Sequence, residues 1–173
     1  MGKDGIHLIL GGARSGKSRR AQALAEAMPG DPVLVATAQP LDEEMAARIA
    51  RHRADRGPRW TTVEAPLDLP GALAGLAGGG RGAVLVDCLT LWATNLLLAE
   101  ADADAATAAL LAAARALDRP LILVANEVGL GIVPDNALAR RFRDLAGTLN
   151  QRVAEAADRV EFVAAGLPLV LKG

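Results

Sequence analysis

Hydrophobic positions along the chain alternate between short unbroken runs and longer runs with helical spacing. Several of the short runs are apolar at consecutive positions, which is typical of strands buried on both faces of a parallel sheet. They predict strands at 6–10, 33–37, 61–64, 83–88, 121–126 and 160–165, with a possible last strand at 169–171. The alanine-rich segments between them predict helices at 17–28, 42–56, 67–76, 90–98, 104–117 and 136–157. Because strands alternate with helices, we expect right-handed β-α-β crossovers and a three-layer α/β fold with a mostly parallel central sheet.

Composition narrows the class of protein. The 173 residues fit a single domain, 1–173, that is large enough to bury a core. A net charge of −1 and only four aromatic residues, two Trp and two Phe, argue against a nucleic-acid partner. The sequence contains no signal-peptide pattern and no membrane-spanning apolar run, and its single cysteine suits a reducing compartment. We therefore expect a cytoplasmic protein without a membrane partner, in which the Cys88 thiol is buried and unreactive.

The candidate chemistry begins with a glycine-rich segment between the first strand and the first helix. Residues 11–18 match the P-loop pattern G-x-x-x-x-G-K-[ST]. The glycines let backbone N–H groups converge on one phosphate, and the helix that follows adds positive partial charge there. We expect Lys17 to reach the β- and γ-phosphates and the Ser18 hydroxyl to hold Mg²⁺. A glycine-rich turn is the alternative, but the flanking strand and helix favour a nucleoside triphosphate site made by Gly11, Gly12, Ala13, Arg14, Ser15, Gly16, Lys17 and Ser18.

Two other strand ends carry polar residues. Asp87 ends the apolar run 83–87, as does the Walker-B aspartate that faces the metal in P-loop proteins. Aspartate also ends strands as a turn residue, but a P-loop in the same chain favours the metal role. The segment 126–134, Asn-Glu-Val-Gly-Leu-Gly-Ile-Val-Pro, follows another strand at the position where α/β proteins bind ligands. From the residues alone, a ligand-binding loop and a plain connector fit it equally well.

His52 is one of two histidines in the chain and lies in the predicted helix 42–56. It continues an apolar stripe at helical spacing, which favours a structural role. A dense group of cations surrounds it, and their charge would disfavour protonation of the imidazole and attract phosphate oxygens, which suits a nucleophile. These cations are Arg48, Arg51, Arg53 and Arg56. The residues leave both roles open, whereas His7, inside a strand, is predicted to be packed or hydrogen-bonded.

Four segments together resemble one family. Residues 11–18, 45–52 (Met-Ala-Ala-Arg-Ile-x-x-His), 126–134 and 139–152 are similar, in order and spacing, to the bifunctional adenosylcobinamide kinase/adenosylcobinamide-phosphate guanylyltransferases of cobalamin biosynthesis. The resemblance implies that ATP or GTP phosphorylates the aminopropanol hydroxyl of adenosylcobinamide. It also implies that GTP gives GMP to a histidine, from which GMP passes to adenosylcobinamide phosphate to form adenosylcobinamide-GDP. A RecA-like P-loop fold and a homotrimer are further implications.

The resemblance also assigns roles to residues. Carried over by motif, the guanylylated histidine is His52, which would be catalytic together with Lys17. Ser18 and Asp87 would hold Mg²⁺. Nucleotide contacts outside the P-loop would come from Ala36, Thr37, Ala38, Arg53, Arg56, Glu64 and Asp87. Many relatives have serine in place of Ala38, so a side-chain hydroxyl contact is not expected there.

Two other functions compete with this interpretation. A small-molecule kinase without nucleotidyl transfer needs the P-loop and Asp87 but leaves His52 without a role. A nucleotide-dependent switch of the GTPase class needs an N-K-x-D motif, and residues 126–129, Asn-Glu-Val-Gly, do not form one. The sequence therefore favours an enzyme that uses GTP, ATP, adenosylcobinamide and its phosphate.

Overall fold

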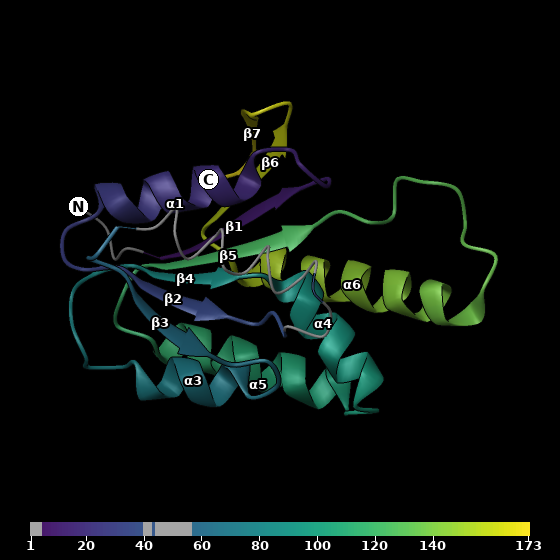
Figure 1. Cartoon of the computed structure of the whole chain (residues 1–173), viewed down its shortest axis with the longest axis horizontal. Helices are drawn as coiled ribbons and strands as arrows, with labels where there is room; N and C mark the ends of the chain where they lie inside the picture. The colour runs from purple at the N-terminus through teal and green to yellow at the C-terminus, as the bar shows by residue number, and fades with distance from the viewer. Residues whose placement is uncertain (1–4, 40–42, 44–56) are drawn as a thin grey trace.

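The computed structural model describes residues 5–39, 43 and 57–173, in which one seven-stranded sheet lies between layers of helices (Figure 1). In chain order the elements are β1 (Ile6–Gly11), α1 (Lys17–Ala27), β2 (Val33–Ala36), β3 (Thr61–Glu64), α3 (Leu69–Gly75), β4 (Val84–Asp87), α4 (Leu89–Leu98), α5 (Ala103–Ala116), β5 (Leu121–Asn126), α6 (Ala137–Ala156), β6 (Arg159–Ala164) and β7 (Leu167–Lys172). Each predicted element inside these ranges is present, with ends shifted by two residues at most. The predicted helix 42–56 lies outside the described residues.

The strand order is β3-β2-β4-β5-β1-β6-β7, and all pairs are parallel except β6 with β7. The expected mostly parallel α/β sheet is therefore confirmed. The antiparallel last strand follows from its connection to β6, which is only two residues long. Ala165 and Gly166 both have positive φ, 51° and 79°, as a tight hairpin turn requires. So short a link cannot make a parallel crossover.

Strand residues alternate between the two faces of the sheet, and each face has its own helical layer. On one face Ile9 and Val124 pack with Ala25 of α1. On the other, Leu8 and Leu123 belong to the larger core beneath α3, α4, α5 and α6. Figure 1 shows α1 on one side of the sheet and α3 and α5 on the other. The three-layer prediction is thus confirmed, and no helix in the described part of the chain is long and apolar enough to cross a membrane.

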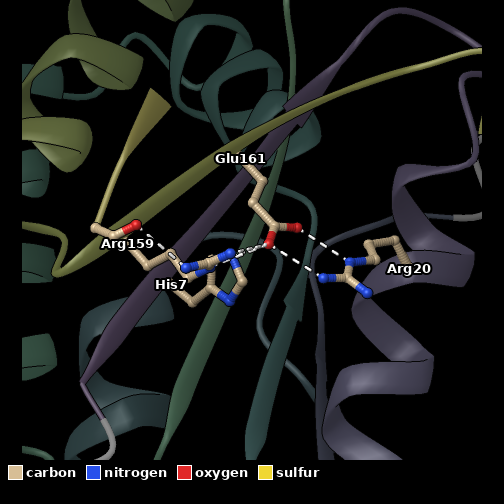
Figure 2. Close-up of polar contacts among 5 residues, drawn as sticks. His7, Arg20, Arg159 and Glu161 are labelled. Atoms are coloured by element: carbon tan, nitrogen blue, oxygen red, sulfur yellow. Dashed lines mark hydrogen bonds and ion pairs between the residues drawn. The ribbon is translucent and has the colours of Figure 1, made fainter. Parts of the chain in front are cut away.

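A buried carboxylate joins α1 to strand β6 (Figure 2). Glu161 of β6 is fully buried and accepts two hydrogen bonds from Arg20 of α1, at 3.0 and 3.1 Å, and one from Arg159, at 3.0 Å. Burial alone would raise the pKa of Glu161, but the two arginines outweigh it and the pKa is lowered. His7 packs beside them, with Nε2 3.7 Å from Glu161 Oε1, and burial lowers its pKa. His7 is therefore packed, as predicted.

Glu161→Gln is expected to lower the free energy of unfolding by about 2 kcal/mol at pH 7, because it weakens charge-assisted hydrogen bonds to Arg20 and Arg159. A carboxylate whose pKa is lowered by folding stabilises the protein above its ordinary pKa of 4.5, and this stabilisation is lost as the pH falls through the folded value. The variant should therefore show a flatter loss of stability below pH 4.5 in urea unfolding curves.

Asp31→Asn is the matched control for Glu161→Gln. Asp31 also pairs with an arginine, Arg59, at 3.2 Å, but the two side chains are 76% and 55% exposed. Such a pair contributes little, so the control should stay within about 0.5 kcal/mol of the parent. Equal effects of the two substitutions would contradict the role given to Glu161.

Candidate nucleotide site

The carboxyl edge of the sheet brings the predicted site residues side by side. Gly11, the last residue of β1 and the first of the P-loop, lies opposite Asn126 of β5. At the end of β2, Ala36 lies opposite Glu64 on one side and Asp87 on the other. One strand, β5, separates the P-loop strand β1 from the Asp87 strand β4. The edge therefore presents a phosphate-binding loop and two carboxylates in one row, where α/β proteins bind ligands.

The P-loop has the strand, turn and helix that the sequence predicts. Gly16, at the N-cap of α1, has φ of 97°, and Arg14 has φ of 55°, so the loop curls through left-handed backbone. Helix α1 starts at Lys17, and no acidic residue lies in its first turn. Lys17 is only 8% exposed and its Nζ donates to Gly12 O at 3.0 Å, while Ser18 is half-buried. The loop and the helix N-terminus together have the geometry that suits an anion.

The turn between β6 and β7 supports the P-loop from outside. Gly166 donates its N–H to the carbonyl of Ser15 at 2.8 Å. A Cβ at Gly16 would lie 3.2 Å from the Gly166 Cα, so glycine at position 16 allows this close approach, whereas Gly166 is favoured by its positive φ of 79°. The Ser15 hydroxyl is buried and has no hydrogen-bond partner among the described residues. Sequence reasoning missed this support, because 150 residues separate the two backbone groups.

Hydrogen bonds from buried polar side chains hold the end of β2 against the end of β4. Thr37 is fully buried, and its Oγ1 donates to Cys88 O at 2.7 Å and accepts from Cys88 N at 3.0 Å. Asn95 of α4 donates to both Thr37 O and Pro66 O at 2.8 Å. The Thr37 hydroxyl is thus engaged within the protein and holds the residue next to Asp87. Asn95 carried no signal in the sequence, since it sits in an apolar helix.

The charges of the site also act on Cys88, the N-cap residue of α4. Burial raises the pKa of the Cys88 thiol to about 11, the negative charge of Asp87 adds to the shift, and the positive charge of Lys17 opposes it. The thiol is protonated at neutral pH, and the prediction that it is buried is confirmed.

Some of the remaining predicted site residues lie at the carboxyl edge of the sheet, and others lie outside the described residues. Ala13, Arg14 and Glu64 are exposed, and Ala38 and Asp87 are half-buried at the same edge. Three predicted site residues lie outside the described ones: His52, Arg53 and Arg56. No cluster of three or more His, Cys, Asp or Glu side chains in 5–39, 43 and 57–173 could hold a metal by itself. A metal here would need oxygen ligands from a nucleotide as well.

The segment after β5 begins beside the P-loop and is hydrogen-bonded to it. Glu127 donates its backbone N–H to Gly11 O at 3.1 Å. Beyond it the connection to α6 extends away from the sheet (Figure 1), and Leu130 and Ile132 are 84% and 98% exposed. This placement puts the start of 126–134 beside the candidate phosphate site.

Comparison with known proteins identifies the family. A family model described as cobinamide kinase / cobinamide phosphate guanyltransferase (CobU) matches residues 7–171. The chain belongs to this family. It is 52% identical over 168 residues, 96% of each chain, to the bifunctional adenosylcobalamin biosynthesis protein CobP of Pseudomonas aeruginosa. It is 43% identical over 181 residues to the protein CobU of the same description from Salmonella typhimurium, covering 95% of this chain and 98% of the relative.

The family assignment agrees with the resemblance seen in the sequence and with the fold. A solved protein from Pyrococcus horikoshii OT3 superposes with a TM-score of 0.57 over 100% of this chain and 88% of its own, at 9% identity, which is a likeness of fold alone. In this member of the CobU family, a P-loop at the end of β1 and an acidic residue at the end of β4, with one strand between them, form the expected RecA-like α/β domain.

Proposed function

We propose that this chain phosphorylates adenosylcobinamide with ATP or GTP and then transfers GMP from GTP to adenosylcobinamide phosphate. The observation that carries the proposal is a P-loop beside Asp87, at the sheet edge of a chain that matches the CobU family over residues 7–171. In this proposal the P-loop binds the triphosphate of the nucleotide in both reactions. The electrophile is the γ-phosphorus of that triphosphate in the kinase reaction and the α-phosphorus in the guanylyl transfer.

The cradle consists of the backbone N–H groups of the P-loop and the Lys17 ammonium. Lys17 Nζ donates to Gly12 O at 3.0 Å, and on nucleotide binding it would donate to phosphate oxygens instead. Because Lys17 is nearly buried, its charge acts with little screening by water. The proposed nucleotide-binding residues are Gly11, Gly12, Ala13, Arg14, Ser15, Gly16, Lys17, Ser18, Ala36, Ala38, Arg53, Arg56, Glu64 and Asp87. Thr37, whose hydroxyl is bonded to Cys88, has a positioning role instead.

A magnesium ion fits the donors at this edge. The Ser18 hydroxyl and the Asp87 carboxylate are hard oxygen ligands, and Mg²⁺ commonly takes one or two such groups together with phosphate oxygens and water. When bound, Mg²⁺ would neutralise charge that develops on the phosphates.

The second reaction requires a nucleophile, and we assign that role to His52. An imidazole nitrogen of His52 forms a bond to the α-phosphorus of GTP, the bond to the α–β bridging oxygen breaks, and pyrophosphate leaves with the electron pair. The imidazole N–H proton is released to solvent. A phosphate oxygen of adenosylcobinamide phosphate then attacks the same phosphorus, the phosphorus–nitrogen bond breaks, and the imidazole takes the electron pair and a proton from solvent, which restores the free enzyme. Lys17 stabilises the charge on the departing pyrophosphate.

Incubation of the protein with GTP labelled at the α-phosphate, followed by denaturation, tests the proposal. We expect an acid-labile, base-stable label and a protein mass increased by one GMP, and we expect cobinamide phosphate to discharge it. Phosphorylation of cobinamide without a protein adduct would instead support the alternative, a small-molecule kinase without nucleotidyl transfer. If no phosphate reaches cobinamide at all, the kinase assignment is wrong as well.

We further propose that the protein is a cytoplasmic homotrimer. Exposed apolar side chains on β7 support an assembly, because a monomer rarely leaves such an edge strand uncovered. These are Leu167, Leu169, Val170 and Leu171. Sedimentation equilibrium should give three times the chain mass of 17.8 kDa, and a single-chain mass at micromolar concentration would contradict the trimer.

A further inference from the structure

Asn126 occupies a position between the two halves of the candidate phosphate site. It is the last residue of β5, which lies between β1 and β4. Its Cα pairs with Gly11, the first P-loop residue, while Asp87 of β4 pairs with Val124. Because strand residues two apart face the same side, Asn126 shares a face with Val124, and it lies about 7 Å further toward the carboxyl edge. That face is the α1 face, since Val124 packs with Ala25.

The side chain of Asp87 lies on the same α1 face of the sheet. Its neighbour two residues back, Leu85, belongs to the α1-side core together with Val124. The strand alternation therefore directs the side chains of both Asp87 and Asn126 to the side on which α1 begins with Lys17. Glu127 lies beyond the end of β5, and its carboxylate accepts from the N–H of Gly129. Asn126 is thus the polar side chain of β5 on the α1 face.

The backbone of Asn126 is held from two helices, whereas its side chain is not. Thr90 Oγ1 of α4 accepts from Asn126 N at 2.6 Å, and Asn150 Nδ2 of α6 donates to Asn126 O at 3.1 Å. Thr90 and Asn150 are both 8% exposed. The side-chain amide of Asn126, half-buried, makes no hydrogen bond in the described part of the chain. Thr90 and Asn150 thus hold the backbone of Asn126, while its side-chain amide remains available for a ligand.

We propose that the Asn126 side-chain amide contacts the γ-phosphoryl group of the bound nucleotide during the kinase reaction. The inference rests on the proposed function. A P-loop that starts at Gly11 and a metal held from Asp87 would place the γ-phosphoryl between β1 and β4, next to Asn126. Thr90 and Asn150 act as positioning residues, because they hold the backbone from which the amide extends.

The chemistry needs a donor at this place. The acceptor hydroxyl oxygen forms a bond to the γ-phosphorus, the bond to the β–γ bridging oxygen breaks, and the nucleoside diphosphate leaves with the electron pair, while the hydroxyl proton goes to solvent. An amide is not a base and takes no proton. The Nδ2–H group of Asn126 instead donates to a γ-oxygen as charge spreads over it, and Oδ1 can accept from the attacking hydroxyl.

The test compares Asn126→Ala and Asn126→Asp with the parent, using ATP and cobinamide for the kinase reaction and α-labelled GTP for adduct formation. Loss of one donor to a transition state costs about 10²-fold in kcat. We expect that loss in phosphoryl transfer by Asn126→Ala, and a larger one in Asn126→Asp, whose carboxylate repels the phosphate. Adduct formation should fall less than about fivefold, because there the γ-phosphate belongs to the leaving group and is not the electrophile.

Asn136→Ser is the matched control. Asn136 lies at the other end of the same connection and caps α6 through Ala139 N, a role that serine also fills. It should keep parental kinetics. A kinase kcat within twofold of the parent in Asn126→Ala overturns the inference. So does an equal loss of kinase, adduct formation and nucleotide affinity, which would indicate a structural role. If the parent itself transfers no phosphate to cobinamide, the failure belongs to the proposed function instead.

Discussion

Lys17→Ala is expected to lower both phosphoryl transfer to cobinamide and GMP adduct formation by about 10³-fold or more. In our proposal the ammonium is the cation that the P-loop places on the phosphates, and the variant removes it from a site where Lys17 is only 8% exposed and weakly screened. Because both reactions use the same cradle in our proposal, the two losses should be of similar size. Rates from quenched single-turnover assays, with nucleotide affinity measured separately, would check this.

Lys172→Ala is the matched control for Lys17→Ala. Lys172 also donates to backbone carbonyls, those of Ala154 and Glu155, but it is exposed and far from the P-loop in the fold. Its removal should leave both rates within twofold of the parent. If Lys17→Ala lost only one reaction, the two reactions would not share a phosphate cradle. Retention of either rate within tenfold would contradict the role of Lys17.

His52→Ala is expected to abolish the GMP adduct and the formation of adenosylcobinamide-GDP, while phosphoryl transfer to cobinamide stays within a few-fold of the parent. Alanine has no lone pair to form the phosphorus–nitrogen bond, so no covalent intermediate can arise. The kinase reaction involves direct attack by the substrate hydroxyl and does not need the imidazole. Intact-protein mass after GTP treatment and separation of the cobinamide products measure the two activities independently.

The chain offers one control histidine, because it has only two. His7 packs against Glu161, away from the carboxyl edge of the sheet, so His7→Gln should retain the adduct. An adduct that persists in His52→Ala would disprove the nucleophile assignment. An adduct lost in His7→Gln, with unfolding still cooperative, would move the assignment to His7.

The fold and the P-loop were predictable because their signals are local. Apolar runs such as 121–125 identify buried strands from consecutive residues, and the glycine-rich motif that includes Lys17 carries its chemistry in eight neighbouring positions. Asp87 was found for the same reason, at the end of one apolar run. The family resemblance, confirmed by comparison, used the same short segments together with their order.

Other parts of the site depend on contacts between distant segments, which no local pattern encodes. Gly166 reaches Ser15 across 151 positions of sequence, and Asn95 reaches Thr37 across 58. Thr90 and Asn95 lie in a mostly apolar helix, so neither stood out as functional. The direction of β7 was equally hidden, because it depends on positive φ at both Ala165 and Gly166, and alanine seldom adopts it.

Contiguous residues were enough to predict the layers of the fold, the P-loop and the acidic residue at the end of β4. What lies between the P-loop and Asp87 depends instead on the order of the strands in the sheet. The order β4-β5-β1 places Asn126 between Asp87 and Gly11, and a segment compatible with a plain connector becomes a candidate part of the phosphate site. The physical reason is that strand neighbours are chosen by packing and backbone pairing across the whole sheet, not by proximity along the chain.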